Sequence, residues 1–110
     1  MANNIFIAFA APAPGREDEF NDWYENTHIG DCLAVDGFVS AKRYRLHANQ
    51  AGEAPADYVT IYELADDQDP AEVIERLNAA VPGMVIAADT IDFGALNKHT
   101  WTATSVDQDS

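Results

Sequence analysis

Cysteine and basic residues are scarce in this chain, and each shortage excludes a class of function. The 110 residues include one cysteine, Cys32, so the chain cannot form an intrachain disulfide framework or a multi-cysteine zinc or iron–sulfur site. Six Lys and Arg stand against nineteen Asp and Glu, which gives a formal net charge of −13 at pH 7. Nucleic acid and anionic membranes are bound mainly through cationic side chains, so we expect neither as a partner.

Hydrophobic runs long enough to cross a membrane are also missing. The apolar run over residues 5–13 is too short to span a bilayer, and residues 1–4 lack the basic region of a signal peptide. We therefore expect a cytoplasmic protein. The hydrophobic fraction of 47% is enough for a real core, so residues 1–110 are expected to form one domain with a polar tail from about residue 102.

The hydrophobic pattern predicts six elements in the order β-α-β-β-α-β. Strands are expected over residues 3–10, 38–47, 58–64 and 90–101, and helices over residues 16–33 and 70–81. The second helix has the clearest start, because Asp69 can cap it, Pro70 suits its first position and Glu72 lies in its first turn. Gly30 is expected to loosen the first helix, and Gly94 to interrupt the last strand with a bulge.

This order predicts a ferredoxin-like α+β sandwich, in which two helices cover one face of a four-stranded antiparallel sheet. The first strand, however, is apolar at both odd and even positions of residues 5–10. Something must therefore cover the second face of the sheet. A second copy of the chain is the simplest candidate, since most soluble homo-oligomers are twofold dimers, and we expect a homodimer.

Two stretches of the first half resemble a known family. Residues 19–29 read EFNDWYENTHI, and residues 33–46 read LAVDGFVSAKRYRL. The Trp-Tyr pair, the following histidine and the Gly-Phe start of a strand resemble the EthD-like branch of the dimeric α+β barrel superfamily, named for ethyl tert-butyl ether degradation. Cys32 departs from this pattern, because the family usually has an aliphatic residue there.

The resemblance implies two sheets that meet at a dimer interface, with a ligand cavity in each protomer between the sheet and its own helices. Relatives in the superfamily include cofactor-free cyclases, dehydratases, decarboxylases, isomerases and monooxygenases that act on aromatic or polyketide-like molecules. Others have no demonstrated activity. We accordingly expect a small aromatic or polyketide-like ligand and no cofactor.

His28 is the first candidate for chemistry. On a helix it lies four residues after Tyr24 and five after Trp23, which places its ring beside an aromatic stripe that faces the sheet. Partial burial keeps an imidazole neutral, so His28 could act as a general acid or base. Asp31, three residues later, could hold one ring nitrogen and assist. The alternative is a structural histidine that bonds a nearby carbonyl and packs on Trp23.

Aromatic side chains are the candidates for substrate binding. Trp23 and Tyr24 could wall a cavity for a flat ligand, although core packing alone would also explain them. Tyr44 and Tyr62 lie on adjacent strands, and either could donate a proton to a carbonyl oxygen if it faces the helices. The pairing register of the strands decides which of them does so.

Two further groups carry weaker interpretations. His28, Asp31 and Cys32 have helical spacing for a metal site, but three ligands at one helix end are a weak pattern, and we expect no metal. Arg43 and Arg45 are expected at a solvated strand end or in an ion pair, with a substrate-carboxylate anchor as the alternative.

The residues and the resemblance together favour a small cofactor-free lyase or isomerase of the dehydratase, cyclase or decarboxylase type. His28 would move a proton on an aromatic or polyketide-like carbonyl compound, in the manner of aromatic compound catabolism. Two alternatives stay open. One is a non-catalytic ligand-binding or stress-responsive dimer, and the other is a cofactor-free or haem-binding monooxygenase of the same superfamily.

Overall fold

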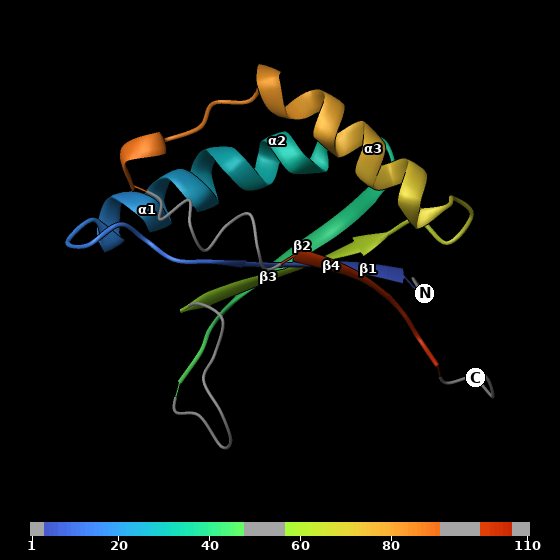
Figure 1. Cartoon of the computed structure of the whole chain (residues 1–110), viewed down its shortest axis with the longest axis horizontal. Coiled ribbons are helices and arrows are strands. Elements are labelled where there is room, and N and C mark those ends of the chain that lie inside the picture. The colour runs from blue at the N-terminus through green and yellow to red at the C-terminus, as the bar shows by residue number, and fades with distance from the viewer. Residues whose placement is uncertain (1–3, 48–56, 91–99, 107–110) are drawn as a thin grey trace.

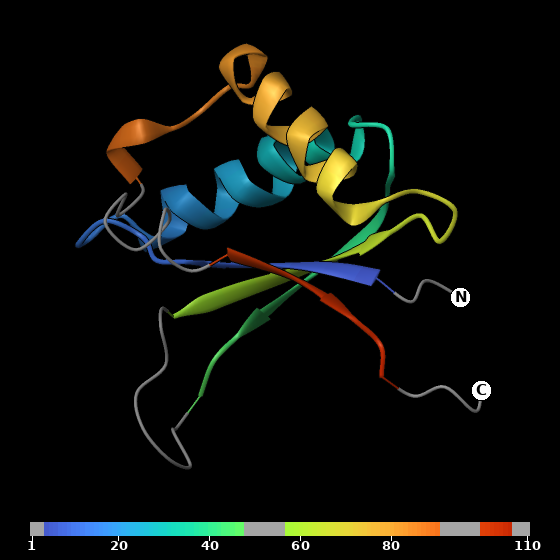
Figure 2. The same ribbon diagram turned by 45° about the vertical axis from the view of Figure 1, so that its right-hand side comes forward.

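The computed structural model describes residues 4–47, 57–90 and 100–106, and its elements follow the predicted order (Figure 1). The sheet is four-stranded and antiparallel, with the order β2-β3-β1-β4 for the strands β1 (Asn4–Ala10), β2 (Phe38–Arg45), β3 (Tyr58–Leu64) and β4 (Thr100–Thr104). The helices α1 (Glu17–Trp23), α2 (Ile29–Leu33) and α3 (Pro70–Ala80) all lie on one face of it (Figure 2). The ferredoxin-like α+β fold is thus confirmed.

Residues 17–33 form one continuous helical segment. Its irregular turn does not lie at Gly30, where the sequence predicted a loosened helix. Between α1 and α2 the chain forms a π-helical turn, η1 (Tyr24–His28), whereas Gly30 keeps an ordinary helical bond from the amide of Ala34 to its carbonyl. The wider turn brings residues five apart onto the same side of the helix. His28 is therefore placed directly against Trp23.

A bulge between Phe38 and Ser40 decides which residues of β2 face the helices. Phe38 pairs with Leu64 and Ala41 with Tyr62, so the inward positions change parity within the strand. With unbroken alternation Phe38 and Arg43 would lie on opposite faces, but the one inserted residue reverses every position beyond it and brings both to the helical face.

The last strand also differs from its prediction. β4 covers Thr100–Thr104 and pairs with β1, with Phe6 opposite Thr102 and Asn4 opposite Thr104. Residues 102–104 are therefore part of the sheet, not of a polar tail, because β-branched threonines suit a strand despite their polarity. The bulge expected at Gly94 lies outside the described residues.

Two clusters of buried side chains join the helices to the sheet. One includes Phe6, Tyr62, Leu64 and Val73 and lies under α2 and α3, and the other includes Phe20 and lies under α1. Within the described ranges, no helix combines the length and apolarity needed to cross a membrane.

Candidate functional site

A pocket of about 340 Å³ lies between the helices and the sheet, in the position that the resemblance implied. Its polar lining consists of Tyr24, His28, Cys32, Tyr62, Asn78 and Thr100. The apolar lining consists of Phe6, Ala8, Leu77, Val81 and Ile86. Pockets of this size and mixed character are typical of small-molecule sites.

His28 is held in the pocket wall by two aromatic neighbours. Its ring stacks on Trp23 with 4.7 Å between centroids, and Tyr24 meets it edge-on at 4.9 Å. The spacing in the sequence predicted both neighbours. The Nδ1 atom is buried and has no hydrogen-bond partner in the described part of the chain, whereas Nε2 lies 3.6 Å from the Sγ atom of Cys32.

The surroundings of His28 keep its imidazole neutral. Burial lowers its pKa from the ordinary 6.5, and the nearby negative charge of Asp31 only partly offsets this effect. The positive charge of Arg43 lowers the pKa further. A neutral imidazole at pH 7 can accept a proton, which is the property that a general base requires.

Two buried tyrosines face the same pocket. Tyr24 and Tyr62 are only 2% and 1% exposed, and burial raises the pKa of each above its usual value of 10.0. The Tyr24 hydroxyl interacts with Thr60 and Tyr62, and the Tyr62 hydroxyl also interacts with Cys32. Both hydroxyls thus stay protonated and can donate hydrogen bonds.

Asp31 makes a different contact from the one that the sequence analysis predicted. Its Oδ2 atom accepts a hydrogen bond of 3.3 Å from the amide of Val85, and among the described residues no hydrogen bond joins it to His28. Trp23 binds the same residue, because its Nε1 atom donates to the Val85 carbonyl at 2.7 Å. Asp31 and Trp23 therefore fix the segment that carries Ile86 into the pocket wall.

Tyr44 lies on the other face of the sheet, away from the pocket. It pairs with Val59 on β3, at the parity opposite to that of Tyr62, and it is 43% exposed. The expectation that Tyr44 contacts a substrate in this pocket is therefore wrong. The bulge in β2 is the reason that its parity could not be read from the sequence.

Arg43 does not lie at a solvated strand end; it forms an ion pair with Glu25, the other expectation, but within one chain and with most of its side chain enclosed. Its side chain is 11% exposed, and the guanidinium lies 4.4 Å from the centre of the Tyr24 ring. It donates to Asn21 Oδ1 at 2.8 Å and to Glu25 Oε2 at 3.0 Å. The guanidinium thus packs against the Tyr24 ring as a cation–π contact and supports its position.

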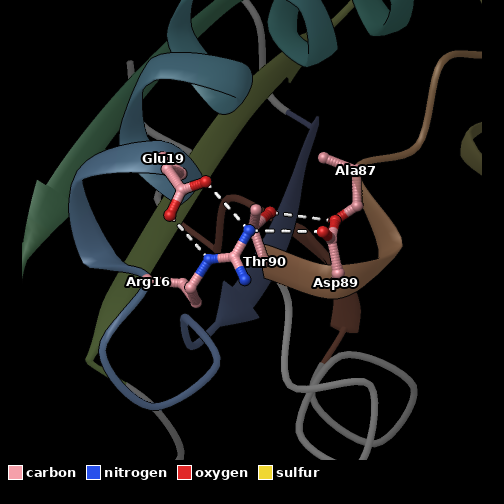
Figure 3. A network of polar contacts seen from close by, with 5 residues as sticks. All are labelled: Arg16, Glu19, Ala87, Asp89 and Thr90. Atoms are coloured by element: carbon pink, nitrogen blue, oxygen red, sulfur yellow. Dashed lines mark hydrogen bonds and ion pairs between the residues drawn. The ribbon is translucent and has the colours of Figure 1, made fainter.

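The segment that follows α3 is tied to the start of α1 by a polar network (Figure 3). Arg16 binds Glu19 at 2.6 Å and Asp89 at 3.2 Å, and Thr90 Oγ1 donates to the carbonyl of Ala87. A backbone bond from the amide of Ala13 to the carbonyl of Thr90 adds to it. The network therefore holds residues 89 and 90, which follow Ile86 in the chain, against the start of α1.

Several pocket residues were not candidates in the sequence analysis. Cys32 had been considered only as a metal ligand, although its place four residues after His28 was a usable signal. Within the described ranges, no three His, Cys, Asp or Glu side chains lie close enough to hold a metal ion. Asn78 on α3, Ile86 in the segment after it and Thr100 on β4 are brought to the pocket by long-range packing, and the sequence alone gives no signal for them.

Comparison with known proteins agrees with this architecture. The family model described as domain of unknown function (DUF4286) matches residues 5–81. No curated protein matches the chain.

Two solved structures are similar over nearly the whole chain. HapK from Hahella chejuensis has a TM-score of 0.66 at 16% identity, with 97% of this chain and 96% of that chain covered. An ethyl tert-butyl ether degradation (EthD) family protein from Bacillus halodurans has a TM-score of 0.57 at 19% identity, with 96% and 99% covered. At these identities the likeness concerns the fold, and it confirms the EthD-like fold that residues 19–46 implied.

Proposed function

Because the chain belongs to the family described as domain of unknown function (DUF4286) and has the EthD-like α+β fold, we propose that its pocket binds an aromatic or polyketide-like carbonyl compound and moves a proton on it without a cofactor. The protein would then be a small lyase or isomerase of the dehydratase, cyclase or decarboxylase type. One observation carries this proposal: a neutral imidazole and two protonated tyrosine hydroxyls converge on a single pocket.

In the proposed chemistry, His28 is the general acid and base. Its neutral imidazole takes a proton from the carbon next to the carbonyl group and returns it at another position. The negative charge that develops on the carbonyl oxygen is stabilised by a hydrogen bond from Tyr62 or Tyr24. Burial supports both roles, because it disfavours the imidazolium and the phenolates alike.

The remaining wall suits a flat, largely apolar ligand. Phe6 and Ala8 form part of the floor on the sheet, and Leu77 and Ile86 close the pocket from the helical side. Apolar surfaces of this kind orient an aromatic ring by burial and leave its polar substituents to the few hydrogen-bonding groups.

A homodimer is the second part of the proposal. The sheet face opposite the helices carries Ile7, Ile61 and Tyr44, together with Trp101, which is 49% exposed. Lys42, opposite Ile61, and Glu63, opposite Ile5, share this largely apolar face. Such a face is typical of an interface, and a second copy of the chain supplies a matching one.

Proton exchange on a simple aromatic ketone tests the proposed chemistry without knowledge of the natural substrate. We expect the protein to accelerate exchange of the α-protons of 2-tetralone in D2O, followed by ¹H NMR. His28→Gln should lower this acceleration by about 10²- to 10⁴-fold, the usual contribution of general acid–base catalysis. His47→Gln is the matched control, because His47 is exposed just beyond the end of β2, and it should retain full exchange.

The same experiment separates the proposed enzyme from a non-catalytic binding protein. If 2-tetralone binds, as a thermal shift would report, but wild-type protein leaves its exchange rate unchanged, the catalytic proposal fails and a ligand-binding dimer is favoured. Full exchange activity in a folded His28→Gln variant would instead remove His28 from the mechanism.

A further inference from the structure

Trp23 contacts His28 but does not itself line the pocket. The indole and imidazole rings are stacked, with 4.7 Å between their centroids and 23° between their planes. The described lining of the pocket includes His28 and Tyr24, whereas Trp23 is not part of it. Any influence of Trp23 on the chemistry of a ligand must therefore pass through the imidazole.

The indole of Trp23 is buried and fixed by three neighbours. Its Nε1 atom donates to the carbonyl of Val85 at 2.7 Å, and the rings of Phe20 and Tyr24 pack around it with centroids at 6.4 Å and 5.4 Å. These contacts hold the plane of the indole close to that of the His28 ring. The π face of Trp23 is thus presented to the imidazole before any proton moves, and the reaction needs no rearrangement of it.

The proposed proton transfer creates a positive charge in an enclosed place. Burial opposes an imidazolium at His28, as its lowered pKa reflects. The carboxylate of Asp31 offsets this effect only in part, and the guanidinium of Arg43 adds repulsion. The group stacked directly on the ring is Trp23, and the face of an indole attracts a cation through its quadrupole.

The other titratable or charged groups that face His28 come from three parts of the fold. They are Tyr24, Asp31 and Cys32 from its own helical segment, Arg43 from β2 and Tyr62 from β3. The described pocket residues of α3, of the segment after it and of β4 carry no titratable side chain. Burial raises the pKa of the two hydroxyls and the thiol, so these groups stay neutral. Trp23 therefore acts beside one anion and one cation, and its substitution removes neither.

We propose that the indole face of Trp23 stabilises the imidazolium that forms when His28 accepts a proton, which makes Trp23 a positioning residue for the proposed reaction. The inference rests on the proposed function for its catalytic consequence. The attraction is strong for the charged ring and weak for the neutral one, so it favours the state reached during proton transfer over the resting state. An aliphatic side chain would bury the imidazole as well but would not attract the charge.

Two variants of Trp23 test the inference through the pH titration of His28, followed by ¹H–¹³C NMR of its Cε1–H group in the full chain. Trp23→Phe and Trp23→Leu both lose the hydrogen bond to Val85, but only phenylalanine keeps an aromatic face. The proton affinity of His28 should decrease from wild type to Trp23→Phe to Trp23→Leu, by about three- to tenfold over the series. A purely structural Trp23 predicts the opposite order, because a smaller side chain admits water, which favours the imidazolium.

Fluorinated tryptophans provide a test that does not depend on the folding of these variants. The chain has two tryptophans, so Trp101→Phe confines the analogue to position 23. Fluorine withdraws electrons from the ring face with little change in size, and each added fluorine should lower the proton affinity of His28 further. Trp101→Phe alone is the matched control, because Trp101 lies opposite Ile7 on the outer face of the sheet, and it should leave the titration of His28 unchanged.

The exchange of 2-tetralone supplies a kinetic readout. At about pH 8, where the imidazole is neutral in every variant, Trp23→Leu should lower the turnover rate by about two- to tenfold. KM should change little, because the indole is not part of the described pocket lining. Trp23→Phe should retain an intermediate rate.

Two results would overturn the inference: a proton affinity of His28 that is equal or higher in Trp23→Leu than in wild type, or one that fluorination of Trp23 leaves unchanged. The titration needs no substrate. A protein with the expected titration series but no exchange activity would therefore leave the inference standing and contradict the proposed function instead.

Discussion

The imidazole of His28 couples the stability of the protein to pH. Its pKa in the folded state is lowered from 6.5, mainly by burial, so the unfolded chain binds a proton at a pH where the folded chain does not. Protonation then favours unfolding. The contribution of His28 to stability is therefore complete above pH 6.5 and is lost as the pH falls toward its folded-state pKa.

We expect this loss to be measurable by urea denaturation between pH 7.5 and pH 5. Relative to His28→Gln, the wild-type free energy of unfolding should decrease by up to about 1.4 kcal/mol for each pH unit between 6.5 and the folded-state pKa. The pH dependence of the variant gives the contribution of the carboxylates, and its subtraction from the wild-type curve leaves the contribution of His28. Parallel pH curves for the two proteins would indicate that His28 is solvated.

At this scale the sequence predicted contacts within one helix and missed those between elements. The position of Tyr24 relative to His28 follows from helical spacing alone, whereas the close contact of Trp23 also depends on the π-helical turn η1. The contact between Asp31 and Val85 joins residues far apart in the chain, and no local pattern encodes it. The enclosed position of Arg43 could not be predicted for the same reason, because it depends on contacts with Asn21 and Glu25 of the helical segment above the sheet.

The turn that leads into β2 is tightly constrained at Gly37. Gly37 has a φ of +104°, and a Cβ atom there would lie 2.6 Å from Val73 Cγ2, which belongs to the buried face of α3. A side chain at this position is therefore opposed by both the backbone conformation and the neighbouring helix. The packing of α3 against the start of β2 depends on this glycine.

Gly37→Ala is expected to destabilise the fold by about 2 kcal/mol or more, since strain and overpacking add. Gly30→Ala is the matched control, because that glycine is helical and exposed with open space around it, and alanine there should stabilise by up to about 1 kcal/mol. Thermal or urea unfolding of both variants measures the contrast. Equal stabilities for the two variants would contradict the expectation.

The order and number of the elements could be predicted because each has a clear hydrophobic period or a cap, as Asp69 illustrates. Its side chain accepts the bond from the Ala71 amide that the sequence pattern indicated. The bulge in β2 and the limits of β4 could not be predicted, because they depend on the partner strands. The sequence therefore indicated the fold and placed His28, but not which strand tyrosines face the pocket.

At the scale of the whole molecule, the apolar outer face of the sheet decides the oligomeric state that we propose. Ile7 lies near its centre, with Ile61 and Trp101 as its neighbours on the adjacent strands. A charge at that point would have to be buried without a partner if two sheets met there. Ile7 is therefore the position at which the dimer is most sensitive.

Size-exclusion chromatography with light scattering should give the wild type a mass of twice the 12.0 kDa of one chain. Ile7→Lys should elute with the mass of a single chain, and Val106→Lys, at a strongly exposed position beyond β4, should leave the dimer intact. A wild-type mass of one chain at micromolar concentration would contradict the proposed assembly.

The alternation of side chains along β1 separates the residues that contact a ligand from those on the outer face of the sheet. Its even positions, Phe6 and Ala8, line the pocket, while its odd positions, Ile5 and Ile7, point away from it. Because neighbouring residues thus serve separate environments, ligand preference and self-association can be altered one at a time on a single strand. Engineering of the cavity would begin with the first set and leave the second untouched.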